Sequence, residues 1–338
     1  MEQLRDYYAQ LQTTLAQRGP GFSAAVLRDG ATVFECHHGL ASLELDVPLT
    51  DDSAYYLASE SKQFTAAAVL SLVRSGAIGL DDDVCPLLPE LAQFEQAFPL
   101  RSLLNHTSGI PDYFPYLECQ LGRHEADYFN NGTILKLIAR LDTVTHATGT
   151  AHRYSNSNYI LLAALVERVA GMPLARYART VLFDPAGMHR LTYDDDRQAV
   201  IAQRVTSYDA DAARPLGYKQ HLGNANTVGD GGIYGSTNEL LRWERQWHAQ
   251  WDDETSLVHA LLQASPLADG SVIPYRFGLE ITERSGHAVV FHGGGLWGFN
   301  TLIVRLPQQR VSVIHLANCE QAGPDLERIV GALLASGT

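Results

Sequence analysis

The sequence contains few cysteines, and no two of them stand at the spacing of a metal or redox motif. The chain has four cysteines in 338 residues, far apart and without a C-x-x-C motif, at Cys36, Cys85, Cys119 and Cys319. This spacing argues against a zinc or thioredoxin-like site. The neighbouring His37 and His38 offer too few ligands for a metallohydrolase. We therefore expect four buried free thiols, no metal site and no cofactor.

The sequence also lacks long apolar runs and runs of basic residues. Its formal net charge is −13 at pH 7, which argues against a nucleic-acid partner. The longest apolar stretches, such as residues 159–166, are far shorter than the ~20 residues that span a bilayer. No basic region followed by an apolar core opens the chain, as it would in a signal peptide. We expect a soluble protein with no membrane partner, cytoplasmic unless a removed leader sent it to the periplasm or outside the cell.

The composition is that of an ordinary compact protein, with 46% apolar and 19% charged residues. Because 338 residues exceed the usual size of a single core, we predict two lobes that enclose a cleft. Residues 22–38 predict a β-hairpin around the turn pair Asp29-Gly30. Residues 59–182 carry apolar side chains at helical spacing, with glycine-containing stops, and predict a mainly helical block.

The carboxyl-terminal part returns to strand patterns. Four β-rich runs lie within residues 275–318, and a final amphipathic helix follows at 325–335. Strands at both ends of the chain predict an α+β fold whose antiparallel sheet pairs the first strands with the last. We place one discontinuous lobe at 1–60 with 226–338, and the inserted helical lobe at 61–225.

The stretch YYLASESKQFTAAAVL, residues 55–70, places a lysine at the start of an alanine-rich helix. The positive end of the helix dipole disfavours a cation there, so helix stability does not explain Lys62. Ser59 and Lys62 are three residues apart and share a helical face, whereas Ser61 points away from Lys62. A desolvated lysine can accept the proton of a serine nucleophile. The alternative is a serine helix cap beside a solvated lysine.

The stretch HRYSNSNYILLAAL places Tyr154 and Asn156 two residues apart just before a helix. In extended or turn backbone, this spacing aims a phenol and an amide at the same place. Helix capping by Ser155, Asn156 or a neighbouring polar residue explains the pattern equally well.

The stretch VVFHGGGLWGFN ends a strand with His292 followed by Gly293, Gly294 and Gly295. Glycines at a strand end allow close approach to the backbone, and their N–H groups can form an oxyanion hole. A glycine bulge that only bends the strand is the structural alternative.

These three elements, S-x-x-K, Y-x-N and H-G-G in this order, resemble the motifs of the serine β-lactamase and penicillin-binding protein superfamily. The resemblance is to class C β-lactamases, D-alanyl-D-alanine carboxypeptidases and β-lactamase-like esterases. Residues 103–113 (LLNHTSGIPDY) and 229–243 (GDGGIYGSTNELLRW) also look typical of this group. The resemblance covers nearly the whole chain. It implies a β-lactamase/transpeptidase-like fold and a serine hydrolase that acts on a small ester, amide or peptide.

The resemblance also implies a role for each residue of the motifs. Ser59 would form an acyl-enzyme, and Lys62 and Tyr154 would share the general-base role. Asn156 would hydrogen-bond Lys62 or the substrate amide. The backbone N–H groups of Ser59 and Gly295 would stabilise the oxyanion.

The third motif departs from the usual Lys-Thr-Gly or His-Thr-Gly. Gly293 replaces the hydroxyl residue that binds a substrate carboxylate, while His292 can still offer a donor or partial positive charge, and Gly294 keeps the last position. We therefore expect a short neutral ester to be preferred over an anionic β-lactam. A weak β-lactamase and a non-catalytic penicillin- or peptide-binding relative remain alternatives. An α/β-hydrolase is disfavoured because no G-x-S-x-G motif is present.

Overall fold

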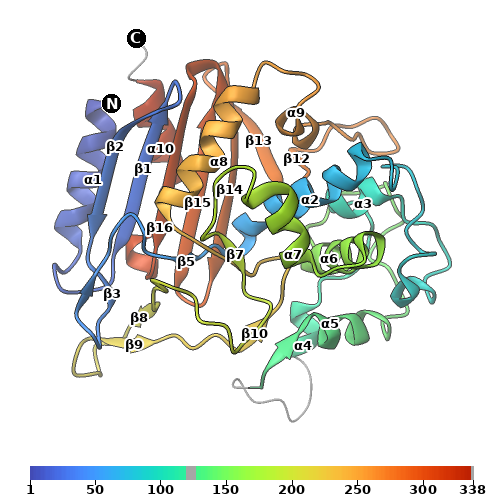
Figure 1. Ribbon diagram of the computed structural model, residues 1–338, viewed down its shortest axis with the longest axis horizontal. Helices are drawn as coiled ribbons and strands as arrows, with labels where there is room; N and C mark the ends of the chain where they lie inside the picture. Colours follow the sequence, from blue (N-terminus) through green and yellow to red (C-terminus); the bar gives the residue numbers. More distant parts are fainter. Residues whose placement is uncertain (119–126, 336–338) are drawn as a thin grey trace.

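The computed structural model describes residues 1–118 and 127–335, and its largest element is a seven-stranded antiparallel sheet. The strand order is β12-β13-β14-β15-β16-β1-β2. The strands are β1 (Phe22–Arg28), β2 (Ala31–His38), β12 (Tyr275–Arg276), β13 (Leu279–Arg284), β14 (His287–Leu296), β15 (Phe299–Leu306) and β16 (Val311–Ala317). The first strand, β1, pairs along its whole length with the last, β16 (Figure 1). The predicted hairpin and the pairing of the two chain ends are both confirmed.

Both faces of this sheet are covered. Phe22, Ala24 and Val26 alternate with Ala25 and Leu27 along β1, as the twofold repeat of a strand requires. The first set packs in a cluster with α1 (Glu2–Thr14) and α10 (Leu326–Leu334). The second set belongs to the larger core on the opposite face, where α8 (Thr237–Gln250) contacts β1 and β16.

The remaining helices gather beside the sheet, at the right of Figure 1. They are α2 (Lys62–Arg74), α3 (Leu100–Leu104), α4 (Phe114–Glu118), α5 (Asn131–Ile138), α6 (Asn156–Ala170), α7 (Leu174–Ala178) and α9 (Leu257–Leu261). Helix α2 packs against α6 and α9, and its first nine residues are all buried. Its alanines allow this close packing on several sides at once. The proposed lobe boundaries at residues 60 and 226 stay a prediction.

Short elements connect these layers. The short strands are β3 (Leu40–Ser42), β4 (Val47–Pro48), β5 (Tyr55–Tyr56), β6 (Phe129–Asn130), β7 (Thr192–Tyr193), β8 (Tyr208–Ala210), β9 (Tyr218–Gln220), β10 (Ala225–Asn226) and β11 (Ile233–Gly235). The single turns of helix are η1 (Ala58–Ser61), η2 (Pro89–Leu91), η3 (Arg179–Phe183), η4 (Pro307–Gln309) and η5 (Glu320–Ala322). Strands β5, β11 and β7 form a small sheet that leads directly into η1 and α2.

The structure corrects the expectation of four buried thiols. Cys319 is buried, but Cys36 and Cys85 are only half-buried, and Cys119 lies outside the described residues. Within residues 1–118 and 127–335, no single helix has the length and apolar character to cross a bilayer. One pair, α6 with residues 174–183, meets that criterion jointly, but it is bent by 73°.

Candidate active site

The serine and lysine of the S-x-x-K motif lie on one face of a helical turn. Ser59 is in the 3-10 turn η1, and Lys62 is the first residue of α2. The Lys62 Nζ donates to the Ser59 Oγ over 3.0 Å. Ala58, just before the serine, has a left-handed backbone with φ of 48°, which is strained for a residue with a Cβ. The chain thus makes a sharp turn that presents Ser59 beside Lys62.

Lys62 has no exposed surface, and its ammonium group makes three hydrogen bonds. Besides Ser59, its acceptors are the Asn156 Oδ1 at 2.8 Å and the backbone carbonyl of Asp230. Burial lowers the pKa of Lys62 to about 8, against the opposing effects of the Asp230 and Asp112 carboxylates. The neutral amine is therefore accessible near neutral pH.

The residues of the second motif, Tyr154 and Asn156, also lie next to Lys62. Asn156 is the first residue of α6, and its backbone N and Nδ2 both donate to the Asp112 Oδ2 at 2.8 Å. This fixes the amide so that its oxygen faces Lys62. The Tyr154 ring lies 5.0 Å from the Lys62 Nζ and packs on His106. Burial raises the pKa of Tyr154 well above 10, although 36% of the residue is exposed.

The third motif lies on β14, and its histidine is inside the protein. The His292 Nε2 is 3.2 Å from the Tyr275 hydroxyl, and its Nδ1 is 2.7 Å from the Gly293 carbonyl oxygen. Burial lowers the pKa of His292 to about 3, and the Lys62 charge adds to this. The side chain is neutral at pH 7, which corrects the expected partial positive charge. The main physical reason is the loss of hydration that a charged imidazole would suffer on burial, and the nearby Lys62 charge adds to it.

The glycines of this motif have different surroundings. A Cβ on Gly294 would lie 2.1 Å from the Leu57 carbonyl oxygen, so this position tolerates only glycine. A Cβ on Gly293 would meet only the Thr301 carbonyl at 3.4 Å, and one on Gly295 would have nothing within 4 Å. β14 therefore lies against the segment that leads to Ser59, with Gly295 at an open edge.

Ser59, Asn156 and Gly295 line a common cavity of about 110 Å³. Its walls are mainly apolar and aromatic, including Phe114 and Trp297. Asp230 is the only charged residue among the described residues that line it. The sequence motifs thus converge on one small, partly apolar space, as is usual for a small-molecule site.

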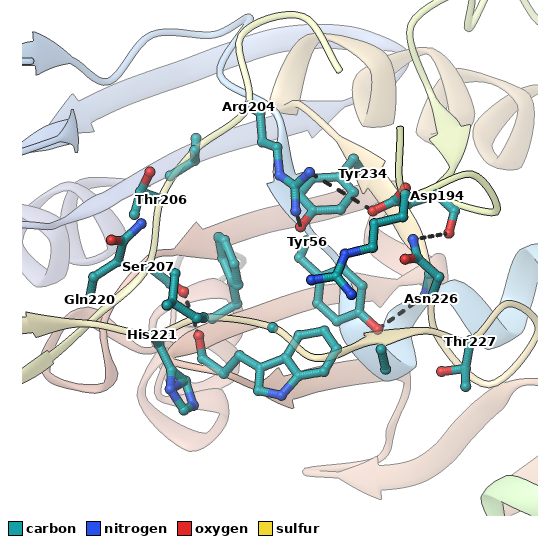
Figure 2. Close-up of a pocket in the computed structure, with 18 of the residues that line it drawn as sticks. Tyr56, Asp194, Arg204, Thr206, Ser207, Gln220, His221, Asn226, Thr227 and Tyr234 are labelled. Atoms are coloured by element: carbon teal, nitrogen blue, oxygen red, sulfur yellow. Dashed lines mark hydrogen bonds and ion pairs between the residues drawn. The ribbon is translucent and has the colours of Figure 1, made fainter. Parts of the chain in front are cut away.

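A second, larger cavity of about 380 Å³ adjoins the first. Tyr56, Ala225, Thr227 and Trp297 line both. Figure 2 shows the second cavity, where the Arg204 guanidinium reaches the Tyr234 hydroxyl at 2.9 Å and the Asp194 carboxylate at 4.0 Å. The two cavities therefore differ in charge. Among the described residues, basic side chains line the second cavity and not the first.

Comparisons with known proteins identify the family of this chain. A family model described as Beta-lactamase matches residues 4–336. The chain belongs to the beta-lactamase family. Its fold is accordingly β-lactamase/transpeptidase-like, with a large antiparallel sheet flanked by helices.

Curated relatives of this beta-lactamase family member carry the name D-aminopeptidase. One from Brucella anthropi is 33% identical over 304 residues, which is 90% of this chain and 57% of the relative. Another, from Brucella melitensis biotype 1, is 31% identical over 309 residues, 91% of this chain and 58% of the relative. The chain therefore spans less than three-fifths of the length of these relatives.

Solved structures share this fold. A penicillin-binding protein homologue from Pyrococcus abyssi, described as octameric, matches with a TM-score of 0.81 and 21% identity, over 100% of this chain and 77% of that one. A D-amino acid amidase from Ochrobactrum anthropi SV3 matches with a TM-score of 0.80 and 19% identity, over 99% of this chain and 100% of that one. At these identities the likeness shows the fold alone.

Several residues of this beta-lactamase family site were not singled out from the sequence. Asp112 orients Asn156, Tyr113 donates to the Asp230 Oδ2 at 2.8 Å, and Tyr275 holds His292. Asp112, Tyr113 and Asp230 lie in the two longer stretches, 103–113 and 229–243, that resemble the family. That likeness is the signal that could have found them, but no local spacing links them to Ser59.

Proposed function

We propose that this chain is a serine amidohydrolase that forms an acyl-enzyme on Ser59 and cleaves small amides, in particular the amino-terminal residue of short peptides or the amide of a single amino acid. The contact between a fully buried Lys62 and the Ser59 hydroxyl carries the proposal. The D-aminopeptidase relatives, at 31–33% identity, support the amide and D-amino-acid substrate class. A small ester would be cleaved through the same intermediate.

The hydrogen bonds of Lys62 define the direction of proton transfer. Once neutral, the amine keeps two N–H groups, which match the acceptors Asn156 Oδ1 and the Asp230 carbonyl. Neither acceptor can donate, so the lone pair of Nζ is directed at the Ser59 hydroxyl. Lys62 therefore acts as the general base for Ser59.

Acylation then follows in balanced steps. The Ser59 Oγ attacks the carbonyl carbon, its proton passes to the Lys62 Nζ, and the carbonyl oxygen becomes an oxyanion bound by the N–H groups of Ser59 and Gly295. The C–N bond breaks, and the leaving amine takes the proton by way of Tyr154. In the second half, water attacks the ester, Lys62 accepts the water proton, and the Ser59 hydroxyl is restored as the acid product leaves.

The walls of the cavity favour small substrates without a negative charge. Gly293 offers no hydroxyl for a carboxylate, His292 is neutral, and Asp230 repels an anion. An anionic β-lactam therefore gains little here, and a D-amino-acid amide or neutral ester loses nothing.

Labelling and turnover test this function together. A fluorophosphonate probe should label the wild type and not Ser59→Ala, and D-alanine p-nitroanilide or p-nitrophenyl acetate should be cleaved with a higher kcat/KM than nitrocefin. Nitrocefin turnover without amide or ester cleavage would instead identify a β-lactamase. Absence of both labelling and turnover would identify a non-catalytic binding protein.

A further inference from the structure

Asp230 is held rigidly at the wall of the active-site cavity. The preceding Gly229 has φ of 112°, and a Cβ there would lie 2.3 Å from the Tyr159 carbonyl oxygen, so the loop is pinned against α6. The Thr65 hydroxyl on α2 donates to the Gly229 carbonyl over 2.7 Å. Lys62 donates to the backbone carbonyl of Asp230 itself. One lysine thus contacts both Ser59 and the backbone of Asp230, and both residues line the same cavity.

The carboxylate of Asp230 has Tyr113 and Thr227 as polar neighbours, but one of its oxygens has no close donor among the described residues. Its Oδ2 accepts from the Tyr113 hydroxyl at 2.8 Å, whereas Oδ1 has no hydrogen-bond partner within residues 1–118 and 127–335. The residue is 5% exposed and lines the cavity. Buried carboxylate oxygens are normally paired, and leaving one unpaired costs free energy. The charge of Lys62 stabilises the carboxylate, but the Lys62 hydrogen bond goes to the backbone carbonyl and leaves Oδ1 without a donor.

The other nearby carboxylates are already engaged. Asp112 accepts from Asn156 with one oxygen and from the backbone N of Phe114 with the other. Asp194 lies in the second cavity, within 4.0 Å of Arg204. Asp230 therefore combines a buried oxygen that has no hydrogen-bond partner with a place in the cavity wall, where no other described lining residue is charged.

We propose that the Asp230 Oδ1 binds the protonated α-amino group of the substrate, which makes this chain selective for amino acid amides and peptides with a free amino terminus. This inference rests on the proposed amidohydrolase function and names the residue that selects its substrate. In such a substrate, the α-nitrogen and the carbonyl carbon are both bonded to the α-carbon. An ammonium group bound to Asp230 therefore holds the carbonyl carbon near the Ser59 hydroxyl. The ammonium supplies the donor that the free oxygen lacks.

The handedness of the substrate follows from the same arrangement. Ser59 and Asp230 define two points of attachment, for the carbonyl and the amino group, and the apolar wall with Phe114 and Leu296 is a third place, for the side chain. Three distinct attachments at one carbon distinguish D from L configuration.

The first experiment compares two substrates that differ only in the amine, D-alanine p-nitroanilide and propionyl p-nitroanilide. We expect the wild type to prefer the free amine, and Asp230→Asn to lower the ratio of the two kcat/KM values by about 30-fold, as for a lost charge-assisted hydrogen bond. Tyr113→Phe keeps the carboxylate and should keep the preference. Asp194→Asn is the matched control and should leave the ratio within about threefold. If Asp230→Asn leaves the ratio within about threefold of the wild type, the proposal is overturned, whatever the effect of Asp194→Asn.

The second experiment measures binding without turnover, so it does not depend on the hydrolase proposal. Ser59→Ala is titrated with D-alaninamide and with propionamide in a calorimeter. D-Alaninamide should bind at least about tenfold more tightly, and Ser59→Ala/Asp230→Asn should lose that difference. Equal affinities, no binding of either amide, or a difference that survives in the double variant would each refute the assignment. If the calorimetric differences are found but the wild type hydrolyses neither amides nor esters, only the proposed hydrolase function is refuted.

Discussion

At the residue scale, Ser59 and Ser61 have separate tasks although only one residue stands between them. Ser59 contacts the Lys62 Nζ, whereas the buried Ser61 hydroxyl accepts from the backbone N of Ile233 in β11 over 3.2 Å. The first serine lies in the candidate site, and the second connects η1 to the small sheet beside it.

Substitution of each serine should therefore affect a different property. Ser59→Ala is expected to abolish fluorophosphonate labelling while the thermal midpoint stays close to that of the wild type. Ser61→Ala should keep labelling but lose about 1–3 kcal/mol of stability, because a buried N–H is left without its acceptor. Labelling gels and denaturant unfolding measure the two effects. Labelling that persists in Ser59→Ala would exclude this serine as the nucleophile.

The lowered pKa of Lys62 predicts how activity depends on pH. The base form is deprotonated, so below the pKa of about 8 its population falls roughly tenfold per pH unit. We expect kcat/KM for p-nitrophenyl acetate to rise from pH 6 to pH 8 and then level off.

A second buried group that titrates in the same range provides the control for this profile. Burial raises the pKa of Glu60 to about 8. The Glu60→Gln variant should keep the rise in activity if Lys62 is the base. A flat profile, or one that disappears with Glu60→Gln, would contradict the role of Lys62.

At the element scale, the position of β14 depends on one close approach between backbones. Gly294 faces the Leu57 carbonyl, which also accepts from the Thr301 hydroxyl of β15 at 3.0 Å. The strand that carries Gly295 is thereby set against the turn that carries Ser59.

A methyl group at this contact should separate the two elements. Gly294→Ala is expected to lower stability by about 1–3 kcal/mol, the usual cost of overpacking, and to reduce kcat/KM by more than tenfold. Gly295→Ala adds the same methyl group in open space and should leave stability within about 1 kcal/mol. Urea unfolding of both variants measures the difference. Equal stabilities would show that the approach of Gly294 to the Leu57 carbonyl does not exclude a Cβ.

At the scale of the whole molecule, a buried ion pair connects the sheet to the helices behind the site. Arg305 of β15 forms a bidentate pair with Glu244 of α8, at 2.6 and 2.8 Å, and the two side chains are 3% and 0% exposed. Arg305 also donates to the Gln63 Oε1 at 2.8 Å, next to Lys62 on α2. Strand β15 and helices α2 and α8 are therefore joined through one guanidinium.

Removing the charge of Glu244 should destabilise the whole fold. Glu244→Gln leaves the Arg305 charge buried without its counterion, and we expect a loss of about 3–5 kcal/mol in the free energy of unfolding. Glu327→Gln breaks the exposed pair with Arg284 and should leave the unfolding midpoint unchanged within error. Guanidinium unfolding of both variants measures the difference. Equal losses of unfolding free energy in the two variants would show that the buried pair stabilises the fold no more than the exposed pair does.

The sequence alone determined the features that depend on neighbours along the chain. β-rich runs predicted the strands at both chain ends, and the Asp29-Gly30 turn predicted the hairpin of the first two. Ser59 and Lys62 are close because residues three apart share a helical face, a property of local geometry. The order of the motifs then indicated the family.

Only the tertiary structure decided the environment of that pair. Lys62 meets Asn156 and Asp230 across 94 and 168 residues, and neither its burial nor its pKa of about 8 can be derived from local spacing. The same holds for the neutral state of His292 and the unpaired oxygen of Asp230. Desolvation depends on every atom packed around a group, and these atoms come from segments that only the complete fold brings together.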